Sequence, residues 1–409
     1  MRVLIVGAGQ AGAQAAISLR QAGFGGGITM VGEEPDLPYE RPPLSKEYLA
    51  GEREAARLLL RPAGFWAERG IEVVTGCRIV AVDAVARTAD AEDGRGFGYD
   101  RLIWAAGGHA RRLPVPGGEL PGVHVIRSRA DVDGLRAELD AATRVVVVGG
   151  GYVGLESAAV LRKAGKTVTV VEAQARLLAR VAGAAVGDFY AAEHRAQGVE
   201  VRLGAGVQLL EAGADGRVAC VRLASGEALP ADLVIVGVGL VPSVAPLVAA
   251  GADSGDGVRV DGHGRTTLPD VYAIGDCAHH PNRFAAGGHV RLESVANAVE
   301  MAKVVAGHVM DGDDARPYEA VPWFWSNQYD LRLQTVGLSA GHDAVVVRGD
   351  PASRSWSLCY LRAGAVVALD CISSPRDYVQ GKALVERGAV VDPARLADPA
   401  VPLKMMLEG

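Results

Sequence analysis

The sequence predicts an α/β protein made of two copies of one βαβ unit and a third, C-terminal domain. The first observation is an internal repeat, in which Arg2–Gly12 aligns with Arg144–Gly154 at an offset of 142 residues. The second is that each copy reads as an apolar strand, a glycine-rich turn and a helix, which is the pattern of a parallel α/β sheet. The third is the length of 409 residues, which suits two or three domains of about 150 residues each.

The charge balance and the glycine content limit what the protein can do. The 42 Lys and Arg residues are outnumbered by 48 Asp and Glu residues, so the formal net charge is −6. A protein that binds phosphate backbones usually carries the opposite sign, and we therefore expect no nucleic-acid partner. The 53 glycines show no triplet period and are suited to tight turns and to close approach of the backbone to a ligand.

Two segments resemble membrane or export signals but are better explained as strands. The apolar run Val3–Val6 is one strand long and ends in glycines, whereas a secretory signal needs a longer apolar region and a cleavage site. The uncharged stretch Leu233–Ala252 has the 20 residues of a membrane span, but it is divided by Gly237, Gly239, Pro242 and Pro246. We therefore expect a buried strand, a turn and a short helix there, and no membrane segment.

Both glycine-rich turns carry the GxGxxG pattern of Rossmann-like dinucleotide-binding folds. The first glycine allows the tight turn, the second lets a pyrophosphate approach the backbone, and the third lets the helix pack closely. A lone match is weak evidence, but both copies here follow an apolar strand and open a helix. We expect cofactor contacts at six glycines, namely Gly7, Gly9, Gly12, Gly149, Gly151 and Gly154.

An acidic residue follows each turn at the spacing expected for a ribose contact. Glu33 lies 21 residues after Gly12, and Glu172 lies 18 residues after Gly154. A carboxylate there accepts a hydrogen bond from a 2′-hydroxyl and repels a 2′-phosphate, which favours NAD over NADP. The alternative for Glu172 is a solvated strand-end carboxylate, and Arg176 is a cation that a phosphate could use. Two dinucleotide folds in one chain suggest FAD together with NADH.

A third segment, Leu268–Cys277, supports the flavin. It reads as a short strand that ends in Gly275-Asp276 before a helical stretch. We expect Asp276 to hydrogen-bond the ribityl chain of a flavin, and the alternative is an ordinary helix N-cap.

The five cysteines indicate a reducing, cytoplasmic setting. Their number is odd and none forms a CxxC motif, so no disulfide framework is expected. Flavoenzymes that reduce disulfides need a thiol beside the flavin, yet residues 34–76 contain no cysteine. Cys277 follows Asp276 directly, but a small buried residue is the simpler interpretation. We expect no metal site.

The segment Pro38–Gly51, with Lys46 in its centre, is more diagnostic than the glycines. With this segment as its most specific part, the whole chain resembles the FAD-dependent NADH:ferredoxin reductases of oxygenase systems. These form the putidaredoxin reductase and biphenyl dioxygenase reductase group, which has the glutathione reductase structural type. The resemblance implies electron transfer from NADH through FAD to a [2Fe–2S] ferredoxin that serves a P450 or a ring-hydroxylating dioxygenase. A flavin suits this task because NADH gives up two electrons together and the cluster accepts one.

The resemblance also implies roles for individual residues. Lys46 is expected beside the reactive edge of the flavin, and Trp323 is expected near the flavin ring. Glu156 is expected to face the nicotinamide carboxamide. The alternative for Glu156 is an ordinary acidic residue on a helix face, and the alternative for Trp323 is a hydrophobic plug between domains. The segments Trp104–Gly108 and Gly239–Ser243 depart from the usual family motifs; the resemblance implies a backbone contact with the cofactor at Gly239. Further FAD contacts are implied at Ala11, Arg41, Ile79, Arg127 and Val295, with core packing as the alternative for Ile79 and Val295.

The predicted domains are an FAD-binding domain in two parts, residues 1–108 and 232–316, an NAD-binding domain at 109–231 and a C-terminal α+β interface domain at 317–409. The last segment has nine Lys and Arg against ten Asp and Glu, so a basic face for a ferredoxin would arise only on folding. Candidate residues are Arg332, Lys382, Arg387 and Lys404, for which solvated surface charges are the alternative.

Two other functions remain open at this point. An NADH:quinone reductase shares both nucleotide folds but usually adds an amphipathic C-terminal helix, for which the tail Pro399–Gly409 is short and interrupted by proline. An NADH-sensing flavoprotein of the apoptosis-inducing-factor type usually carries long insertions. We expect a ferredoxin partner, no membrane contact, and a monomer or weak homodimer.

Overall fold

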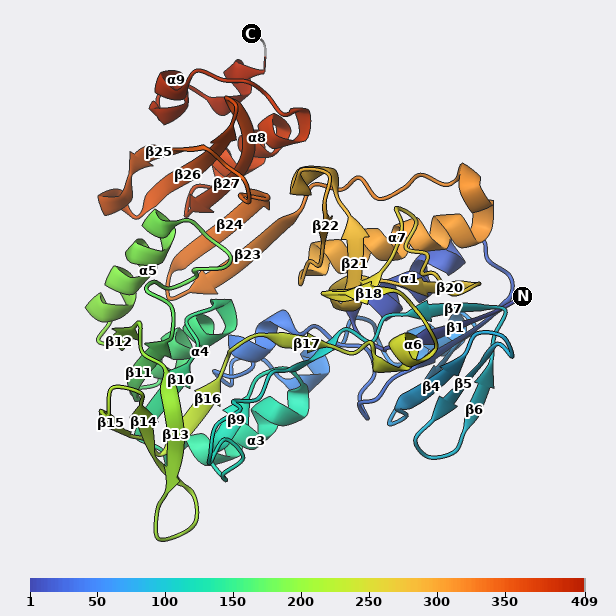
Figure 1. Cartoon of the computed structure of the whole chain (residues 1–409), viewed down its shortest axis with the longest axis horizontal. Coiled ribbons are helices and arrows are strands. Elements are labelled where there is room, and N and C mark those ends of the chain that lie inside the picture. The colour runs from blue at the N-terminus through green and yellow to red at the C-terminus, as the bar shows by residue number, and fades with distance from the viewer. Residues whose placement is uncertain (408–409) are drawn as a thin grey trace. The chain divides into compact units, whose positions relative to one another are not determined.

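The computed structural model describes residues 1–407, in which contacts divide the chain into two compact units (Figure 1). The last two residues of the tail Pro399–Gly409 lie outside the described part. The four-segment domain division predicted from the sequence stays a prediction. Unit 1 comprises 1–40, 58–109 and 241–324, and unit 2 comprises 41–57, 110–240 and the chain from 325 onward.

Unit 1 is built on a five-stranded parallel sheet in the order β20-β7-β1-β2-β3. Residues Val3–Val6 of β1 are all at most 5% exposed, because a parallel sheet is covered on both faces and therefore reads as a continuous apolar run. Helix α1 (Gln10–Gln21) packs on β1, β2 and α7 (Val295–Asp311). The strands are β1 (Arg2–Val6), β2 (Gly27–Val31), β3 (Ile71–Val74), β7 (Arg101–Trp104) and β20 (Val271–Ala273).

Smaller elements complete unit 1. An antiparallel sheet is formed by β4 (Ile79–Asp83), β5 (Thr88–Ala91) and β6 (Gly96–Gly98). Helix α2 packs on β3, and α6 packs on β4. The remaining elements are α2 (Gly64–Glu68), α6 (Ala245–Ala249) and the sheet of β18 (Ser254–Gly255), β19 (Gly257–Arg259), β21 (Ala278–Pro281) and β22 (His289–Val290). The chain passes between the units within β8 (Gly108–Ala110) and β17 (Leu240–Pro242).

Unit 2 repeats the parallel design with the strand order β12-β11-β10-β16-β9. Helix α4 (Tyr152–Lys163) packs on β10 and β11, and α5 (Ala184–Ala196) packs on β12. The other elements are α3 (Arg129–Leu139), the parallel strands β9 (Val123–Val125), β10 (Arg144–Val148), β11 (Thr167–Glu172), β12 (Glu200–Leu203) and β16 (Leu233–Val236), and the antiparallel sheet of β13 (Val207–Ala212), β14 (Val218–Leu223) and β15 (Ala228–Pro230). Together with unit 1 this confirms the predicted α/β class with two Rossmann-like folds.

The C-terminal part of the chain forms a five-stranded sheet in the order β23-β24-β27-β26-β25. Neighbouring strands from β24 to β25 in this order are antiparallel, and helix α8 (Pro375–Arg387) packs on β24 and β27. The predicted α+β character is therefore confirmed. The strands are β23 (Trp323–Gln328), β24 (Leu331–Gly337), β25 (Ala344–Asp350), β26 (Ser355–Arg362) and β27 (Ala365–Ile372), followed by α9 (Pro393–Ala397).

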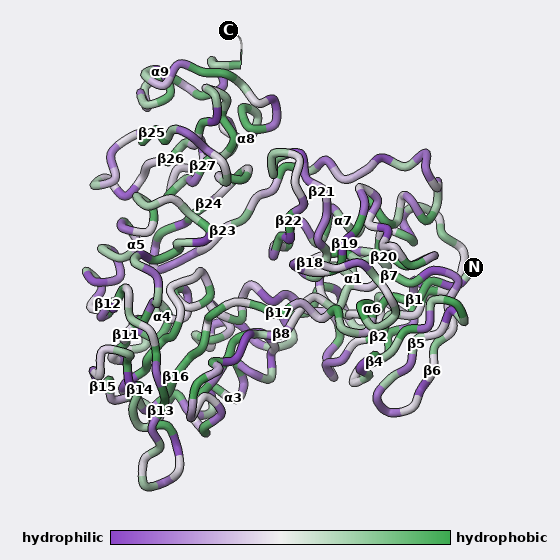
Figure 2. Tube along the Cα trace, in the orientation of Figure 1, coloured by the Kyte–Doolittle hydropathy of each residue, from purple (hydrophilic) through white to green (hydrophobic). Residues whose placement is uncertain are grey.

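The stretch that resembles a membrane span begins with a strand of the unit 2 sheet. Leu233–Val236 forms β16, which is coloured as hydrophobic in Figure 2 and is at most 3% exposed. Short β17 and α6 follow it, as the breakers in the sequence predict. Among residues 1–407, no helix is both long enough and apolar enough to cross a membrane.

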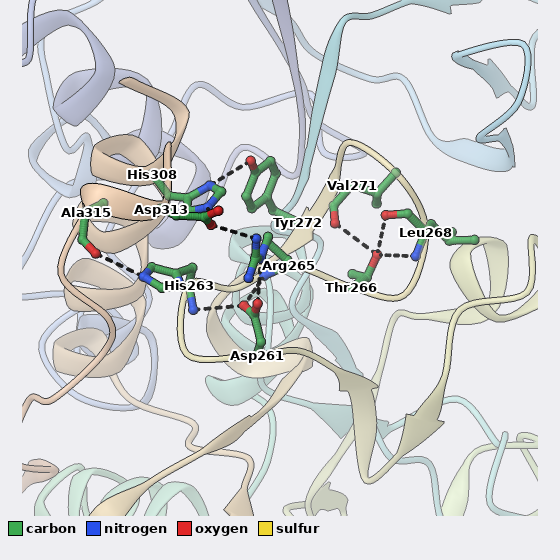
Figure 3. Close-up of polar contacts among 10 residues, drawn as sticks. All are labelled: Asp261, His263, Arg265, Thr266, Leu268, Val271, Tyr272, His308, Asp313 and Ala315. Carbon is green, nitrogen blue, oxygen red and sulfur yellow. Dashed lines mark hydrogen bonds and ion pairs between the residues drawn. The ribbon is translucent and has the colours of Figure 1, made fainter. Parts of the chain in front are cut away.

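A polar cluster in unit 1 fixes the chain where it leaves α7 (Figure 3). His263 Nε2 lies 3.0 Å from the carbonyl oxygen of Ala315, and the Arg265 guanidinium lies 3.0 Å from Asp313. His308, on the last turn of α7, lies 3.0 Å from the Tyr272 hydroxyl through Nδ1 and 3.4 Å from Asp313 through Nε2. The segment that leads toward the C-terminal sheet is therefore tied to unit 1 as far as Ala315.

Candidate functional site

The first glycine-rich turn, in unit 1, has no room for side chains at two of its glycines, so the turn can contact a ligand there only through its backbone. Gly7 has φ +114°, and a Cβ there would lie 2.2 Å from the Ala105 carbonyl oxygen. A Cβ on Gly12 would lie 1.9 Å from the Gly7 carbonyl oxygen, so only glycine lets α1 approach the turn. Gly9 caps α1 without any side-chain hydrogen bond. The first amides of the helix are thus not capped by a side chain, as a diphosphate site requires.

The second turn, in unit 2, has the same construction. Gly149 has φ +111°, and a Cβ there would lie 2.4 Å from the Gly237 carbonyl oxygen. A Cβ on Gly154 would lie 2.1 Å from the Gly149 carbonyl oxygen. Gly151 caps α4 with no side-chain hydrogen bond. Both turns therefore fit a dinucleotide for the same two reasons: a Cβ would clash at their glycines, and the first amides of the following helix have no side-chain cap.

The two acidic residues have different surroundings. Glu172 ends β11 and accepts hydrogen bonds from the amides of Gly150 and Gln174, each at 2.7 Å. Its carboxylate is held beside the second turn and keeps lone pairs for a ribose hydroxyl. Glu33 is about half exposed, with Arg78 and His109 each 3.9 Å away. It is the less constrained of the two.

Lys46 and Glu156 form a buried ion pair within unit 2. Lys46 Nζ lies 2.7 Å from Glu156 Oε2, and the Glu156 side chain is 4% exposed. The Ser45 hydroxyl donates to the same carboxylate oxygen at 2.5 Å, and the Ser326 hydroxyl donates to Oε1 at 2.7 Å. Because both carboxylate oxygens of Glu156 accept hydrogen bonds and the charge is paired with Lys46, the carboxylate can remain ionised in a buried site. The motif around Lys46 contains Ser45, whereas no local signal in the sequence marks Ser326.

A row of hydrogen bonds extends from Ser326 along the C-terminal sheet. Gln328 donates to the Ser326 hydroxyl at 3.2 Å, and its carbonyl oxygen lies 2.9 Å from His194 Nε2. The amide carbonyl is an acceptor only, so Nε2 carries a proton and Nδ1 accepts from the Tyr329 hydroxyl, 3.1 Å away. Burial lowers the pKa of His194, which keeps the ring neutral. No signal in the sequence links Ser326, Gln328 and His194, because they share no spacing or motif.

The remaining predicted FAD residues fall into two groups. In unit 1, Ala11 lies next to Gly275, since a Cβ on Gly275 would be 3.0 Å from the Ala11 Cβ; Asp276 follows in the same 3-10 turn. In unit 2, Arg41 donates to the Arg127 carbonyl oxygen at 2.7 Å. The roles of the whole set stay predictions, including Ile79, which is 6% exposed in the core of unit 1, Val295 at the start of α7, and half-buried Trp323 at the start of β23.

Gly239 lies close to a cation. It has φ +106°, and a Cβ there would lie 3.4 Å from Arg180 Nη2. Arg176, by contrast, donates to the carbonyl oxygens of Ala179 and Ala182 at 2.9 and 2.8 Å. Its guanidinium therefore holds the loop together instead of being presented to a phosphate.

The cysteines offer no reactive thiol pair. All five are free, and all except Cys220 are buried. Burial raises the pKa of Cys277 to about 12, and its thiol donates to the Ile274 carbonyl oxygen at 3.3 Å. A thiol in this state does not act as a nucleophile at neutral pH.

Comparisons with known proteins cover almost the whole chain. The family described as pyridine nucleotide-disulphide oxidoreductase matches residues 1–302, and the family described as reductase C-terminal matches residues 323–407. The chain is 57% identical over 401 residues to the 5,5'-dehydrodivanillate O-demethylase ferredoxin reductase subunit of a Sphingobium species, with 98% of this chain and 97% of that protein covered. It is 39% identical over 409 residues to putidaredoxin reductase of Pseudomonas putida, with 99% and 96% covered.

A solved structure is similar over the same length. The crystal structure of the covalent putidaredoxin reductase–putidaredoxin complex matches with a TM-score of 0.95 and 39% identity, covering 100% of this chain and 98% of that one. The ferredoxin reductase for the CYP199A2 system of Rhodopseudomonas palustris also matches with a TM-score of 0.95 and 39% identity, covering 99% of each chain.

Proposed function

Because the chain belongs to the pyridine nucleotide-disulphide oxidoreductase family, we propose that it is an FAD-dependent NADH:ferredoxin reductase. Its acceptor is a [2Fe–2S] ferredoxin that serves a P450 or a ring-hydroxylating dioxygenase. The names of its relatives support this assignment, since they include ferredoxin reductases of an O-demethylase, of p-cumate dioxygenase and of putidaredoxin. One NADH and two oxidised ferredoxins give NAD⁺, one proton and two reduced ferredoxins.

The observation that carries the proposal is the combination of two equivalent glycine-rich turns with a buried, satisfied Lys46–Glu156 pair and no accessible dithiol. A bound flavin accepts two electrons together and releases them singly. A disulfide reductase would need a low-pKa thiol to take electrons onward, and burial raises the pKa of Cys277 instead. An external one-electron carrier is therefore the acceptor that this chain suits.

The residues of the chain then have positioning and electrostatic tasks. The amides at the starts of α1 and α4 bind diphosphates, which need the unsubstituted glycines at both turns. The fixed cation of Lys46 favours negative charge on a neighbouring ring, and Glu156 with its two serine donors fixes where that cation lies.

The preferred donor is NADH. Glu172 is held beside the second turn by the amides of Gly150 and Gln174, where its charge repels a 2′-phosphate. Arg176 cannot offset this repulsion while it is bound to loop carbonyls. We further propose a cytoplasmic monomer or weak homodimer, and the free cysteines agree with a reducing compartment.

The test is anaerobic mixing of the FAD-loaded protein with NADH or NADPH in a stopped-flow instrument, followed by addition of a [2Fe–2S] ferredoxin. We expect rapid flavin bleaching by NADH, much slower bleaching by NADPH, and fast reduction of the ferredoxin. A stable long-wavelength band that ferredoxin does not discharge would contradict the proposal and favour an NADH sensor. Discharge by a quinone alone would favour a quinone reductase.

A further inference from the structure

The loop Leu177–Gly183, here called the ribose loop, joins the region after β11 to α5. Near its start the Leu178 amide donates to the Gly150 carbonyl oxygen at 2.9 Å, and Gly150 belongs to the second glycine-rich turn. Further along, Arg180 lies beside Gly239. The ribose loop is therefore in contact with the second glycine-rich turn, which the proposed function assigns to NADH, and with Gly239, a predicted cofactor contact.

The internal shape of the ribose loop is fixed by residues next to it. Arg176 donates to the carbonyl oxygens of Ala179 and Ala182. A Cβ on Gly187, in α5, would lie 2.4 Å from the Leu177 carbonyl oxygen. We therefore treat the ribose loop as a rigid segment, whose position depends on the contacts at its C-terminal end, Gly183.

That far end is held by the C-terminal sheet. The Gly183 amide donates to the Tyr360 phenol oxygen at 2.8 Å, and the Tyr360 hydroxyl donates to the Asp370 carboxylate. Tyr360 is fully buried on β26, and Asp370 is 5% exposed on the neighbouring strand β27. A Cβ on Gly183 would lie 2.5 Å from the phenol oxygen, so this contact requires glycine.

The three groups form one directed chain of hydrogen bonds. A phenol that donates to a carboxylate becomes a better acceptor, which strengthens the bond from the Gly183 amide. Loss of the phenol oxygen would leave a half-buried amide and a buried carboxylate without this partner, and an unpaired buried polar group is costly. These hydrogen bonds therefore stabilise one position of the ribose loop over others.

We propose that Tyr360 and Asp370 are positioning residues for the pyridine nucleotide: from the C-terminal sheet they hold the ribose loop against Gly150 and Gly239 and so set the affinity for NADH. This inference rests on the proposed function, because it takes the second turn as the NADH site. It gives the C-terminal sheet a task in nucleotide binding that is separate from any contact with an acceptor.

The experiment uses the FAD-loaded protein and ADP-ribose, which carries the adenosine diphosphate and ribose but cannot transfer electrons. Tyr360→Phe removes only the phenol oxygen, and Gly183→Ala disturbs the same contact from the other side. For both variants we expect the calorimetric Kd for ADP-ribose and the KM for NADH to rise about five- to tenfold, the effect of one lost hydrogen bond at a partly buried site. We expect kcat to stay within about twofold and the flavin spectrum to be unchanged, because neither residue touches the reacting atoms.

Two matched controls separate positioning from general damage. Tyr190→Phe removes another buried phenol oxygen, one without a hydrogen-bond partner in residues 1–407. Asp377→Asn disturbs a second buried carboxylate of the C-terminal part, which binds Arg348 and Ser357 at 3.1 and 2.9 Å and lies off the loop. Both controls should keep the wild-type Kd, although Asp377→Asn should lower the Tm.

Wild-type binding by Tyr360→Phe and Gly183→Ala, or equal weakening by Asp377→Asn, would overturn the inference and leave the proposed function intact. If the wild-type protein itself bound no ADP-ribose, the second turn would not be a nucleotide site, and the proposed function would fall together with the inference.

Discussion

The ammonium of Lys46 and the carboxylate of Glu156 lie 2.7 Å apart although 110 residues separate them in the chain. Lys46 follows the 3-10 turn Pro42–Ser45, and Glu156 lies near the start of α4. Two segments with different sequence signatures, a proline-rich motif and a glycine-rich turn, thus meet at one buried ion pair.

Replacing Lys46 by Met should destabilise the protein by about 3 kcal/mol, because it leaves the Glu156 charge buried with only its hydroxyl donors. The double variant Lys46→Met with Glu156→Gln should regain much of that loss. Urea unfolding of all four forms measures the coupling. Exposed Arg112 and Glu119, 3.2 Å apart, serve as the control pair, with a coupling of about 0.5 kcal/mol. A similar coupling energy at both pairs would contradict the buried role.

The two glycine-rich turns should be separable by mutation. Gly12→Ala places a Cβ 1.9 Å from the Gly7 carbonyl oxygen and should yield protein with little bound flavin, seen as a loss of the visible flavin absorbance. Gly154→Ala should keep the flavin and lose NADH binding. Gly25→Ala, where nothing lies within 4 Å, should behave as wild type. The reverse pattern of losses would mean that the two turns bind the opposite cofactors.

Glu172 should control the choice between NADH and NADPH. Glu172→Ala removes the repelling charge, and we expect kcat/KM for NADH to fall about tenfold while the value for NADPH falls less or rises. Arg176→Ala should weaken both donors alike, because its guanidinium holds loop carbonyls. Steady-state rates with each donor decide the matter, and an unchanged NADH:NADPH ratio in Glu172→Ala would refute the assignment.

Acid should weaken the attachment of β16 to β10. The Arg144 guanidinium, 2.5 Å from the Asp232 carboxylate, lowers the pKa of Asp232 to about 2. A carboxyl whose folded pKa is lowered stabilises the fold above its ordinary pKa of 3.8, and this contribution is lost as the pH falls toward 2. Because the Asp232 side chain is 29% exposed, we expect about 1–2 kcal/mol.

The matching measurement is denaturant unfolding of wild type and Asp232→Asn at pH 5.5 and pH 3. The wild-type protein should be the more stable of the two at pH 5.5, and the gap should narrow by about half at pH 3. A gap that is independent of pH would show that the carboxylate charge does not contribute.

Local patterns in the sequence were enough to predict the fold class. A GxGxxG turn between an apolar strand and a helix is contained within about 30 residues, so both βαβ units could be found, and Gly7 and Gly149 show the positive φ that such a turn needs. Lys46 was found because a resemblance marks its motif.

Contacts between distant strands could not be predicted in this way. Ser326 reaches Glu156 across 170 residues, and Tyr360 reaches Gly183 across 177. Each is an ordinary Ser or Tyr in a strand, where the same residue types serve packing or the surface equally well. Only the pairing of the C-terminal strands and their position beside α4 and α5 gives these side chains their partners.

The burial of the cysteines makes the chain suitable for site-directed labelling. Thiol reagents react with accessible thiolates, and only Cys220 is even partly accessible among the five. With Cys220→Ser in place, the folded protein should give almost no reaction with a thiol dye. A single new cysteine at Val379, which is 68% exposed on α8, would then carry one fluorophore or spin label on the C-terminal part, so that its motion during a redox cycle could be followed without background.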